Sequence, residues 1–269
     1  VKYFAFLYDF RLNVLIKKFY ICYLSISKIL DLMTEENFCP RCFSFHSSLG
    51  QHWLNSVSCF EPQFSKKQKD IITGCLMGDG SISCPKKTPY FRITNIQKEY
   101  LKYLDQSLKP FSNGVREGRS SEQLAKQEDN GWNVDPSNYN DEYWLKTWCL
   151  EQLHSLHQWY SSGKKVFPEG LQLTPTVLKH WYVCDGWYSV PKSSKRGRFI
   201  IRADNESDNK EKLDSYFEKS VGISVDYWRM EDDGEKCALV FFADKSEKIF
   251  DYIGEPLPGF EYKWPGEQS

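Results

Sequence analysis

The hydrophobic and polar positions predict two similar helices in separate parts of the chain. The first begins with Ser65 and Gln68, a capping-box pair in which each side chain satisfies a backbone N–H at the helix start. The second begins with Thr174 followed by Pro175, a residue favoured at the first helical position. Apolar residues then recur at helical spacing: Ile72, Leu76 and Met77 in the first segment, and Val177, Leu178 and Trp181 in the second. We therefore expect two amphipathic helices, each ending at an Asp-Gly pair.

Strand-like and helical patterns follow each of these helices in a similar order. After the first helix, the predicted strands are Tyr90–Ile96 and Glu142–Trp148, and the predicted helices are Lys98–Leu108 and Leu150–Tyr160. After the second, the predicted strands are Arg198–Ala203, Ile223–Met230 and Cys237–Phe242, and the predicted helices are Asn209–Val221 and Ser246–Ile253. The repeated order indicates an internal duplication whose residue identities have diverged.

Composition narrows the class of protein but does not identify a partner. With 269 residues and 41% hydrophobic content, the chain can bury a core. Lys plus Arg (35) nearly balance Asp plus Glu (36), so any DNA-binding surface needs basic residues gathered on one face. The nine cysteines are mostly scattered, which is typical of a reducing, intracellular compartment such as the cytoplasm, the nucleoid or an organellar matrix.

The apolar stretch 14–30 is interrupted by three lysines, so we expect no membrane span. Met33 stands directly before the first organised motif. We expect residues 1–32 to be an upstream extension outside the native protein. Mass spectrometry showing a native chain that begins at Val1 would refute this hypothesis.

The two predicted helix ends carry the candidate chemistry. A single Asp-Gly pair is usually only a turn, but Asp79-Gly80 and Asp185-Gly186 close two equivalent helices. A carboxylate at a helix C-terminus faces the negative end of the helix dipole, a cost of about 0.3 to 1 kcal/mol. Two such ends side by side would need a cation, and hard oxygen ligands suit Mg²⁺. We expect a shared metal site at Asp79 and Asp185, with Gly78 and Cys184 as further ligands.

Glycines around these ends have two expected roles. Gly74 and Gly78 lie four residues apart on one face of the first helix, where another helix can approach closely. Gly80 and Gly186 can adopt the left-handed conformation that often ends a helix.

The first of these segments resembles the LAGLIDADG motif of homing endonucleases, and the second resembles its variant ending in W-[YF]-x-x-D-G; the likeness extends over Ser65 to Pro265. The resemblance implies a monomeric α/β (α+β) protein with two pseudo-symmetric αββαββα halves and curved antiparallel sheets that straddle double-stranded DNA. It also implies hydrolysis of both strands of a long target with Mg²⁺ or Mn²⁺. The second motif differs from the family pattern at His180 and Cys184, where small residues are usual, which bears on how closely this helix can pack.

Two basic segments also resemble family signatures. The sequence around Lys165 is similar to K-K-x-I-P, and the sequence around Lys263 is similar to Y-K-x-P. By this resemblance Lys165 and Lys263 reach the active centre, where they stabilise phosphorane charge or order water. Judged without the family, each would be an ordinary solvated lysine, and Lys164 competes with Lys165 for the role.

The predicted DNA surface consists of basic and amide side chains on strand-like segments after each motif. Arginine can read guanine edges, and lysine can hold phosphates. The residues are Arg92, Asn95, Arg116 and Arg119 in the first half, and Lys192, Lys195, Arg196, Arg198 and Arg202 in the second. For the segment 192–196, a solvated loop is the alternative.

A cysteine-bearing segment precedes the first motif. Cys39 and Cys42 form a C-x2-C knuckle, and His52 and Cys59 complete a ligand set with the spacing of a small zinc site. His46 is the alternative fourth ligand, and a loop with incidental cysteines is the alternative to zinc. Zinc would organise a segment that is too short to fold on its own core, and an accessory DNA-binding role fits.

The predicted organisation is an extension at 1–33, a zinc-finger-like module at 34–62, and two halves at 63–162 and 163–269. Two other functions remain open: an intron RNA maturase, which would bind RNA with weak or absent DNA cutting, and a regulator that binds DNA without cleaving it. The presence of both aspartates argues against the regulator.

Overall fold

The computed structural model describes residues 38–39, 41–42, 44–56, 58–59, 61–123, 140–160, 163–192, 194, 196–231 and 236–266. The chain divides into a unit at Val1–Phe60 and a larger unit at Glu61–Ser269. The described part of the smaller unit contains antiparallel strands β1 (Phe38–Cys39) and β2 (Ser44–Phe45), followed by helix α2 (Leu49–Asn55). The predicted extension at 1–33 lies outside the described residues.

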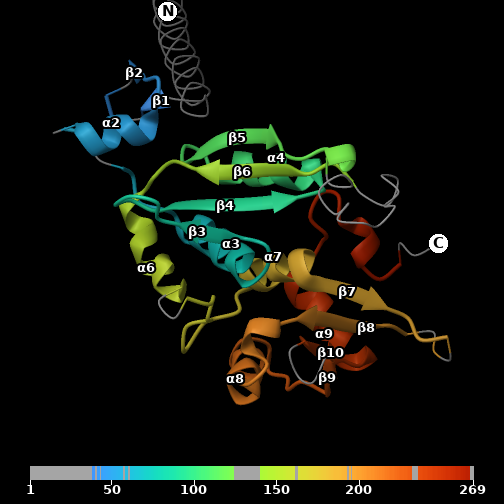
Figure 1. Ribbon diagram of the computed structural model, residues 1–269. Helices are drawn as coiled ribbons and strands as arrows, with labels where there is room; N and C mark the ends of the chain where they lie inside the picture. The colour runs from blue at the N-terminus through green and yellow to red at the C-terminus, as the bar shows by residue number, and fades with distance from the viewer. Residues whose placement is uncertain are drawn as a thin grey trace, which may run out of the picture. The chain divides into compact units, whose positions relative to one another are not determined.

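The larger unit repeats the order αββαββα (Figure 1). The first copy consists of α3 (Lys66–Met77), β3 (Ser81–Ser83), β4 (Tyr90–Asn95), α4 (Lys98–Ser107), β5 (Ser112–Glu117), β6 (Tyr143–Thr147) and α6 (His154–His157). The second consists of α7 (Pro175–Asp185), β7 (Gly186–Ser189), β8 (Arg198–Arg202), α8 (Lys210–Val221), β9 (Tyr227–Glu231), β10 (Lys236–Phe241) and α9 (Ala243–Ile253). The duplication predicted from the sequence is therefore present.

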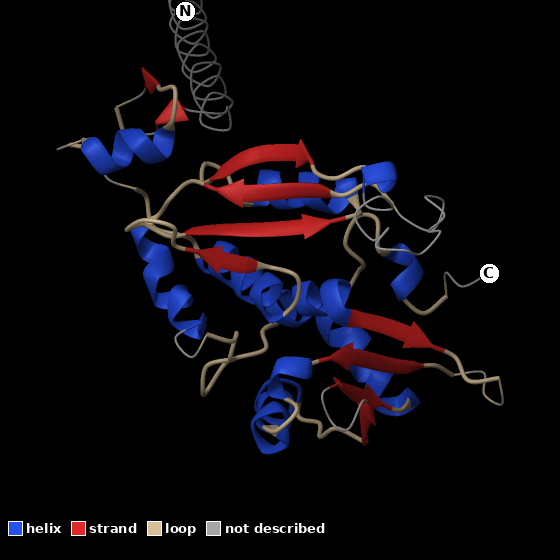
Figure 2. Ribbon diagram, in the orientation of Figure 1, coloured by secondary structure: helices blue, strands red, loops and turns tan. Residues whose placement is uncertain are grey.

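Each copy forms one open antiparallel sheet (Figure 2), and the strand orders are equivalent: β3-β4-β6-β5 and β7-β8-β10-β9. One face of each sheet packs on helices, because alternate residues such as Phe91 and Ile93 in β4, or Phe199 and Ile201 in β8, are buried. The intervening residues point outward. Helices α3 and α7 lie side by side between the two sheets (Figure 1).

Local hydrogen bonds explain where the two motif helices begin. The hydroxyl of Ser65 accepts from the backbone N–H of Gln68 at 3.2 Å, and the Gln68 amide oxygen accepts from the N–H of Ser65 at 3.0 Å. Thr174 caps α7 by accepting from the N–H of Val177, with Pro175 in the first turn. Both predicted caps are confirmed.

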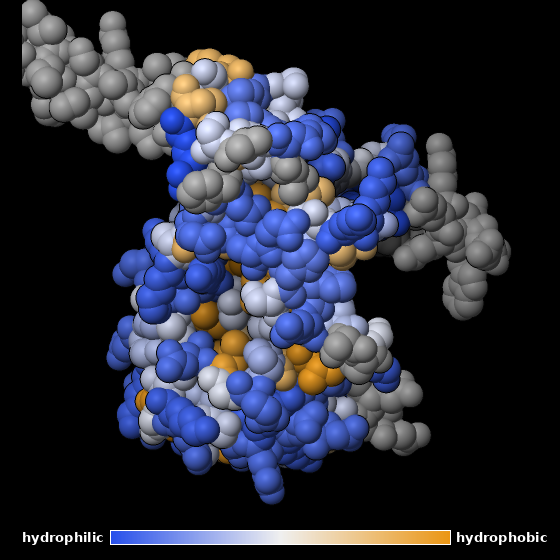
Figure 3. Space-filling model, turned by 90° about the vertical axis from the view of Figure 1, so that its left-hand side faces the viewer, coloured by the Kyte–Doolittle hydropathy of each residue, from blue (hydrophilic) through white to orange (hydrophobic). Residues whose placement is uncertain are grey.

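Several other expectations differ from the structure. Strands β3, β5 and β7 were not predicted, because they are short or polar and become strands only by pairing with neighbours. The predicted helix at Leu150–Tyr160 is a one-turn α6 between 3-10 turns at Glu151–Leu153 and Gln158–Tyr160. None of the described helices is long and apolar enough to cross a membrane. The side of the larger unit that carries α6 and α8 is mostly hydrophilic, with small apolar patches (Figure 3).

Candidate active site

Glycines on α3 bring the two motif helices into close contact. A methyl group placed on Gly74 would lie 2.4 Å from the carbonyl oxygen of Val177, and one placed on Gly78 would lie 2.3 Å from Cβ of Cys184. His180 and Cys184 of α7 thus sit opposite glycines of α3. The larger residues in the second motif are compatible with close packing because the first helix lacks side chains at the facing positions.

The buried His180 also ties α7 to the first half. Its Nδ1 is 2.8 Å from the hydroxyl of Tyr100 on α4 and 3.8 Å from the thiol of Cys75 on α3. Burial lowers the pKa of His180 to about 3, so the ring is neutral and takes part in this hydrogen-bond network without charge.

Gly80 and Gly186 do not end their helices in the left-handed conformation. Gly186 has φ −102 and ψ 160 and begins β7, while Gly80 is not among the described glycines with positive φ. Both glycines are needed for space instead. A methyl group on Gly186 would lie 2.1 Å from the Tyr182 ring, and one on Gly80 would lie 2.7 Å from the carbonyl oxygen of Cys75.

The two aspartates meet where the motif helices end. Helix α3 ends at Met77, so Asp79 lies in the turn that follows, whereas Asp185 is the last residue of α7. The Asp185 carboxylate lies 3.2 Å from the point where a Cβ on Gly78 would be. Asp185 therefore lies at the end of α3 as well as at the end of α7, and Asp79 lines a cavity together with Cys184 of α7.

Burial and mutual repulsion disfavour charge on this pair. Burial, followed by the charge of Asp79, raises the pKa of Asp185 to about 7, against the opposing effect of Lys165 and Lys263. Burial also raises the pKa of Asp79, although its carboxylate keeps solvent-accessible surface, and the same two lysines oppose the change. A cavity of about 290 Å³ lies beside them, lined in part by Asp79, Cys184 and Lys263. The cavity therefore leaves room for a bound group beside the two carboxylates. A cation bound there would stabilise their charged forms.

Two lysines hold the carbonyl oxygens at these helix ends. Lys165 Nζ donates to the carbonyl oxygens of Gly78 (2.5 Å) and Gly80 (3.4 Å), at the end of α3. Lys263 Nζ donates to those of Val183 (2.8 Å) and Gly186 (2.7 Å), at the end of α7. The arrangement is nearly symmetric and favourable, because cations are stabilised at helix C-termini.

Burial lowers the pKa of both Lys165 and Lys263, while the aspartates counteract that effect. Lys164, the competing candidate, is exposed. The structure thus brings Asp79, Asp185, Lys165 and Lys263 into one cluster.

The segment that carries Lys165 is anchored by a buried carboxylate. Glu206 accepts from the backbone N–H of Phe167 at 2.5 Å and is fully buried beside Lys212. The hydroxyl of Tyr216 donates to the carbonyl oxygen of Pro168 at 2.6 Å. Sequence reasoning did not identify Glu206, because Phe167, the residue that it anchors, lies 39 residues away along the chain.

The surroundings of the two aspartates differ. The Asn95 amide, at the end of β4, donates to Asp79 Oδ2 at 3.3 Å. At the corresponding end of β8, the carboxylate of Asp204 further raises the pKa of Asp185. Asn95, which was predicted as a DNA contact, thus has its side chain beside Asp79.

The outward face of the first sheet gathers cations around one indole. Arg92, Arg116 and Lys146 lie 5.3, 5.6 and 5.7 Å from the ring of Trp144. Strand register explains this cluster, because Arg92 pairs with Lys146 and Arg116 pairs with Trp144. Trp144 and Lys146 were missed by sequence reasoning, although the alternation Trp144-Leu145-Lys146-Thr147 was a usable signal.

The remaining predicted DNA residues fall into separate groups. Arg198 and Arg202 are exposed on the outward face of β8, and Lys192 lies exposed in a turn. Arg202 also lies 3.8 Å from the carboxylate of Asp204, and Arg196 forms ion pairs with Asp244 and Glu247 of α9. Arg119 forms a bidentate pair with Glu142, and Lys195 lies outside the described residues. Arg229 on β9, also exposed, was not predicted.

The cysteine module brings four candidate ligands together. Ligand atoms of Cys39, Cys42, His52 and Cys59 all lie within 4.8 Å of one another. Ligands around a tetrahedral zinc are separated by about 3.8 Å at most, so a small contraction would suit the ion. His46 stacks on His52 with ring centroids 3.5 Å apart, and its Nε2 is 3.2 Å from the Cys42 thiol.

Comparison with known proteins gives three findings. A sequence model of the LAGLIDADG DNA endonuclease family matches residues 69–249. No curated protein sequence matches this chain. Solved structures similar to it include the homing endonuclease I-WcaI bound to its DNA recognition sequence, at 14% identity over 75% of this chain and 88% of that one, with a TM-score of 0.62.

Two further structures are less similar. LAGLIDADG homing endonuclease I-GzeII in complex with its DNA target is 12% identical over 72% of this chain and 86% of that one, with a TM-score of 0.43. I-DmoI in complex with DNA and Ca is 14% identical over 72% and 95%, with a TM-score of 0.40. The likeness to I-WcaI confirms the predicted fold.

Proposed function

This chain belongs to the LAGLIDADG DNA endonuclease family, and on that premise we propose that it is a homing endonuclease, which hydrolyses both strands of a long, specific DNA site with divalent metal. One observation carries the proposal: two aspartates, one at the end of each motif helix, lie close enough to interact electrostatically beside two partly buried lysines. Burial raises the pKa of both carboxyl groups, and the charge of Asp79 raises the pKa of Asp185 further. A site arranged in this way favours the binding of cations.

The donor set fits Mg²⁺ or Mn²⁺. Asp79 and Asp185 offer carboxylate oxygens, and main-chain carbonyl oxygens at Gly78 and Cys184 are the further candidates, all hard oxygen ligands. The Gly78 oxygen already accepts from Lys165, which leaves one lone pair. When bound, the metal would supply a water of lowered pKa and neutralise charge on the phosphate.

The protein's own groups would act around that phosphate. Lys165 and Lys263 hold the helix-end carbonyls in place and put positive charge beside the aspartates. That charge would stabilise the extra negative charge of the pentacovalent phosphorus and order water around it. Asn95 keeps the Asp79 carboxylate oriented through its amide hydrogen bond.

The two outward sheet faces are the proposed DNA-binding surface. They carry Arg92, Arg116 and Lys146 in the first half and Arg198 and Arg202 in the second, all within strands. I-WcaI, which shares this fold, is described as bound to its DNA recognition sequence. Because both motif helices belong to one chain, a monomer contains the complete aspartate pair.

Cleavage of a plasmid carrying the intronless insertion site, with Mg²⁺ added or omitted, tests the proposal. We expect linear product only with metal, and we expect Asp79→Asn or Asp185→Asn to lower its rate by about a thousandfold. Lys164→Met, at an exposed neighbour of the site, is the matched control. Tight binding of intron RNA without plasmid cutting would favour the maturase, and specific DNA binding without cutting would favour the regulator.

We further propose that Cys39, Cys42, His52 and Cys59 bind one structural Zn²⁺, with an accessory DNA-binding role for this module. The proposal is supported by the mutual proximity of four good zinc ligands, which lie on β1, in the turn before β2, on α2 and in the loop after α2. Elemental analysis of the purified chain should find about one zinc per molecule, reduced in Cys39→Ser and Cys59→Ser but retained in His46→Ala. Zinc-free wild-type protein would contradict the site, and loss of zinc in His46→Ala with retention in His52→Ala would reassign the fourth ligand.

A further inference from the structure

The outward face of the second sheet contains an apolar floor. Ile200, Ala238 and Val240 are buried, at 6%, 6% and 3% exposure, and form a cluster with the partly buried Trp187. Strand register aligns them, because Ile200 pairs with both Val240 and Trp187 across neighbouring strands. Successive side chains of a strand point to opposite faces of the sheet. The cluster therefore lies on the face opposite to the helix-packed residues Phe199, Ile201 and Leu239.

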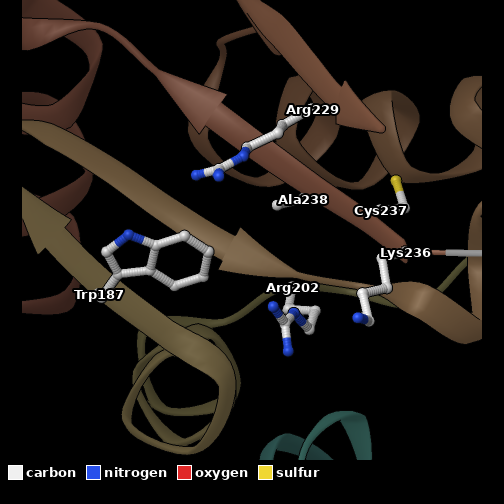
Figure 4. Close-up of a pocket in the computed structure, with 6 residues that line it drawn as sticks. All are labelled: Trp187, Arg202, Arg229, Lys236, Cys237 and Ala238. Atoms are coloured by element: carbon white, nitrogen blue, oxygen red, sulfur yellow. The ribbon is translucent and has the colours of Figure 1, made fainter. Parts of the chain in front are cut away.

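A small recess opens beside this floor. Its volume is about 60 Å³, and its lining includes Trp187, Ala238 and the cations Arg202, Arg229 and Lys236 (Figure 4). Arg229, Trp187 and Arg202 lie around Ala238, while the thiol of Cys237 points away from them (Figure 4). No carboxylate is among the described residues that line it. The recess is therefore apolar at its base and cationic at its rim.

The equivalent face of the first sheet has a different character. There the outward positions of β3 and β4 are polar or charged, such as Ser81, Ser83 and Arg92, and the central aromatic residue Trp144 is surrounded by cations. Among the described strands, the second sheet therefore has an apolar floor on its outward face and the first sheet does not. A partner that contacts both faces would meet different chemistry on each.

We propose that this recess receives the 5-methyl group of a thymine in the major groove of the target site. The inference rests on the proposed function, since it assigns one base to one half of the same DNA interface. The cationic rim selects a polyanionic partner by charge complementarity. In the major groove, the thymine methyl is the apolar group on a base edge, and a 60 Å³ recess accepts a group of that size but not a protein side-chain cluster. Arg202 and Arg229, which flank the recess, suit neighbouring guanines or phosphates.

Replacement of thymine by deoxyuridine tests this proposal, because it removes only the methyl group. The full-length protein is first used, without divalent metal, to select bound duplexes from a randomised pool. Each thymine of the selected site is then replaced singly, and each duplex competes with its parent for the same protein. We expect about a threefold to fivefold loss of affinity at one or two positions, all on one side of the centre of the site.

Variants at Ala238 locate the effect in the recess. Ala238→Val fills the recess, and Ala238→Ser keeps its size but makes its base polar. In either variant the thymine-to-deoxyuridine affinity ratio at those positions should fall towards one, while ratios at all other positions stay unchanged. Competition reports a ratio within one protein sample, so a smaller folded fraction does not alter it.

Three outcomes would overturn the proposal. The first is a wild-type protein that binds a specific duplex but shows no loss at any thymine, which leaves the proposed endonuclease function intact. The second is a loss that persists undiminished in both Ala238 variants. The third is the absence of any sequence-specific duplex binding, which removes the proposed function as well.

Discussion

The two halves of the larger unit share one architecture yet give equivalent carboxylates different surroundings. Asp79 lies in a turn, is exposed, and accepts a hydrogen bond from the neutral amide of Asn95. Asp185 ends its helix, is half-buried, and has the carboxylate of Asp204 nearby, with a pKa raised to about 7. Duplication thus supplies the symmetric frame, and local neighbours set the charge state of each half.

The lysines show the opposite behaviour, because two dissimilar segments reach equivalent positions. Lys165 precedes α7, and Lys263 lies in a short 3-10 turn near the end of the chain. Each donates two hydrogen bonds to the carbonyls at one motif-helix end. Both halves therefore share one feature, a lysine that donates hydrogen bonds to the carbonyl oxygens at the end of a motif helix.

The largest expected effect tests whether the two lysines are equivalent. Lys165→Met and Lys263→Met should each lower cleavage by about a hundredfold to a thousandfold, because each removes a preorganised positive charge from the phosphate site. Duplex binding should change much less. Single-turnover cleavage and duplex affinity are measured together, with Lys164→Met as the matched exposed control.

Equal losses of binding and cleavage would instead identify the lysine as a contact to the DNA backbone. A large effect for only one of the two would show that the halves do not contribute equally.

The next effect concerns how glycines on one helix accommodate larger residues on the other. Gly78→Ala puts a methyl group against Cβ of Cys184 and should lower the free energy of unfolding by about 1 to 3 kcal/mol. Adding Cys184→Gly removes the obstructing atom and should recover part of that loss, although glycine in a helix itself costs about 1 kcal/mol. Urea unfolding of the two single variants and the double variant gives the coupling.

Gly74→Ala is the matched control for this exchange. Its methyl group would meet the backbone carbonyl oxygen of Val177 at 2.4 Å as well as Cβ of His180 at 2.7 Å. Because no side-chain substitution removes the carbonyl, His180→Gly should recover a smaller share of the loss than Cys184→Gly does. Additive losses at Gly78 and Cys184 would contradict the facing arrangement of the two helices.

The smallest expected effect is the contribution of Asp185 to the pH dependence of stability in the metal-free protein. Asp185 has a folded pKa of about 7, above its unfolded value of about 3.9, so the folded state holds the extra proton between these values. The free energy of unfolding should therefore fall as pH rises through this window, by roughly 1 to 2 kcal/mol, and level off above it. Stabilisation by added Mg²⁺ should increase over the same range, because ionised Asp185 is the binding form.

Thermal unfolding of wild type and Asp185→Asn between about pH 5 and about pH 8 measures the difference. Subtracting the variant is necessary because His180, with its pKa lowered to about 3, acts in the other direction. Its stabilising contribution is present above about pH 6.5 and declines as pH falls. A wild-type curve parallel to that of Asp185→Asn would contradict the raised pKa of Asp185.

The sequence by itself determined the features that depend on near neighbours along the chain. The caps at Ser65 and Thr174 use partners three residues away, so the starts of both motif helices were predictable, and the two Asp-Gly pairs followed from their positions. The duplicated order of elements was also visible, because periodicity is a local property of each segment. Even the family resemblance rested on these short stretches.

Only the tertiary structure decided the features made by residues distant along the chain. Strands β3, β5 and β7 exist through pairing with β4, β6 and β8, and register alone gathers three cations around Trp144. Long-range contacts also gave predicted residues partners that the sequence did not indicate: Asn95 donates to Asp79, and Arg196 forms ion pairs with α9. A side chain's identity fixes which bonds it can make, but its partner is chosen by the packing that brings distant segments together.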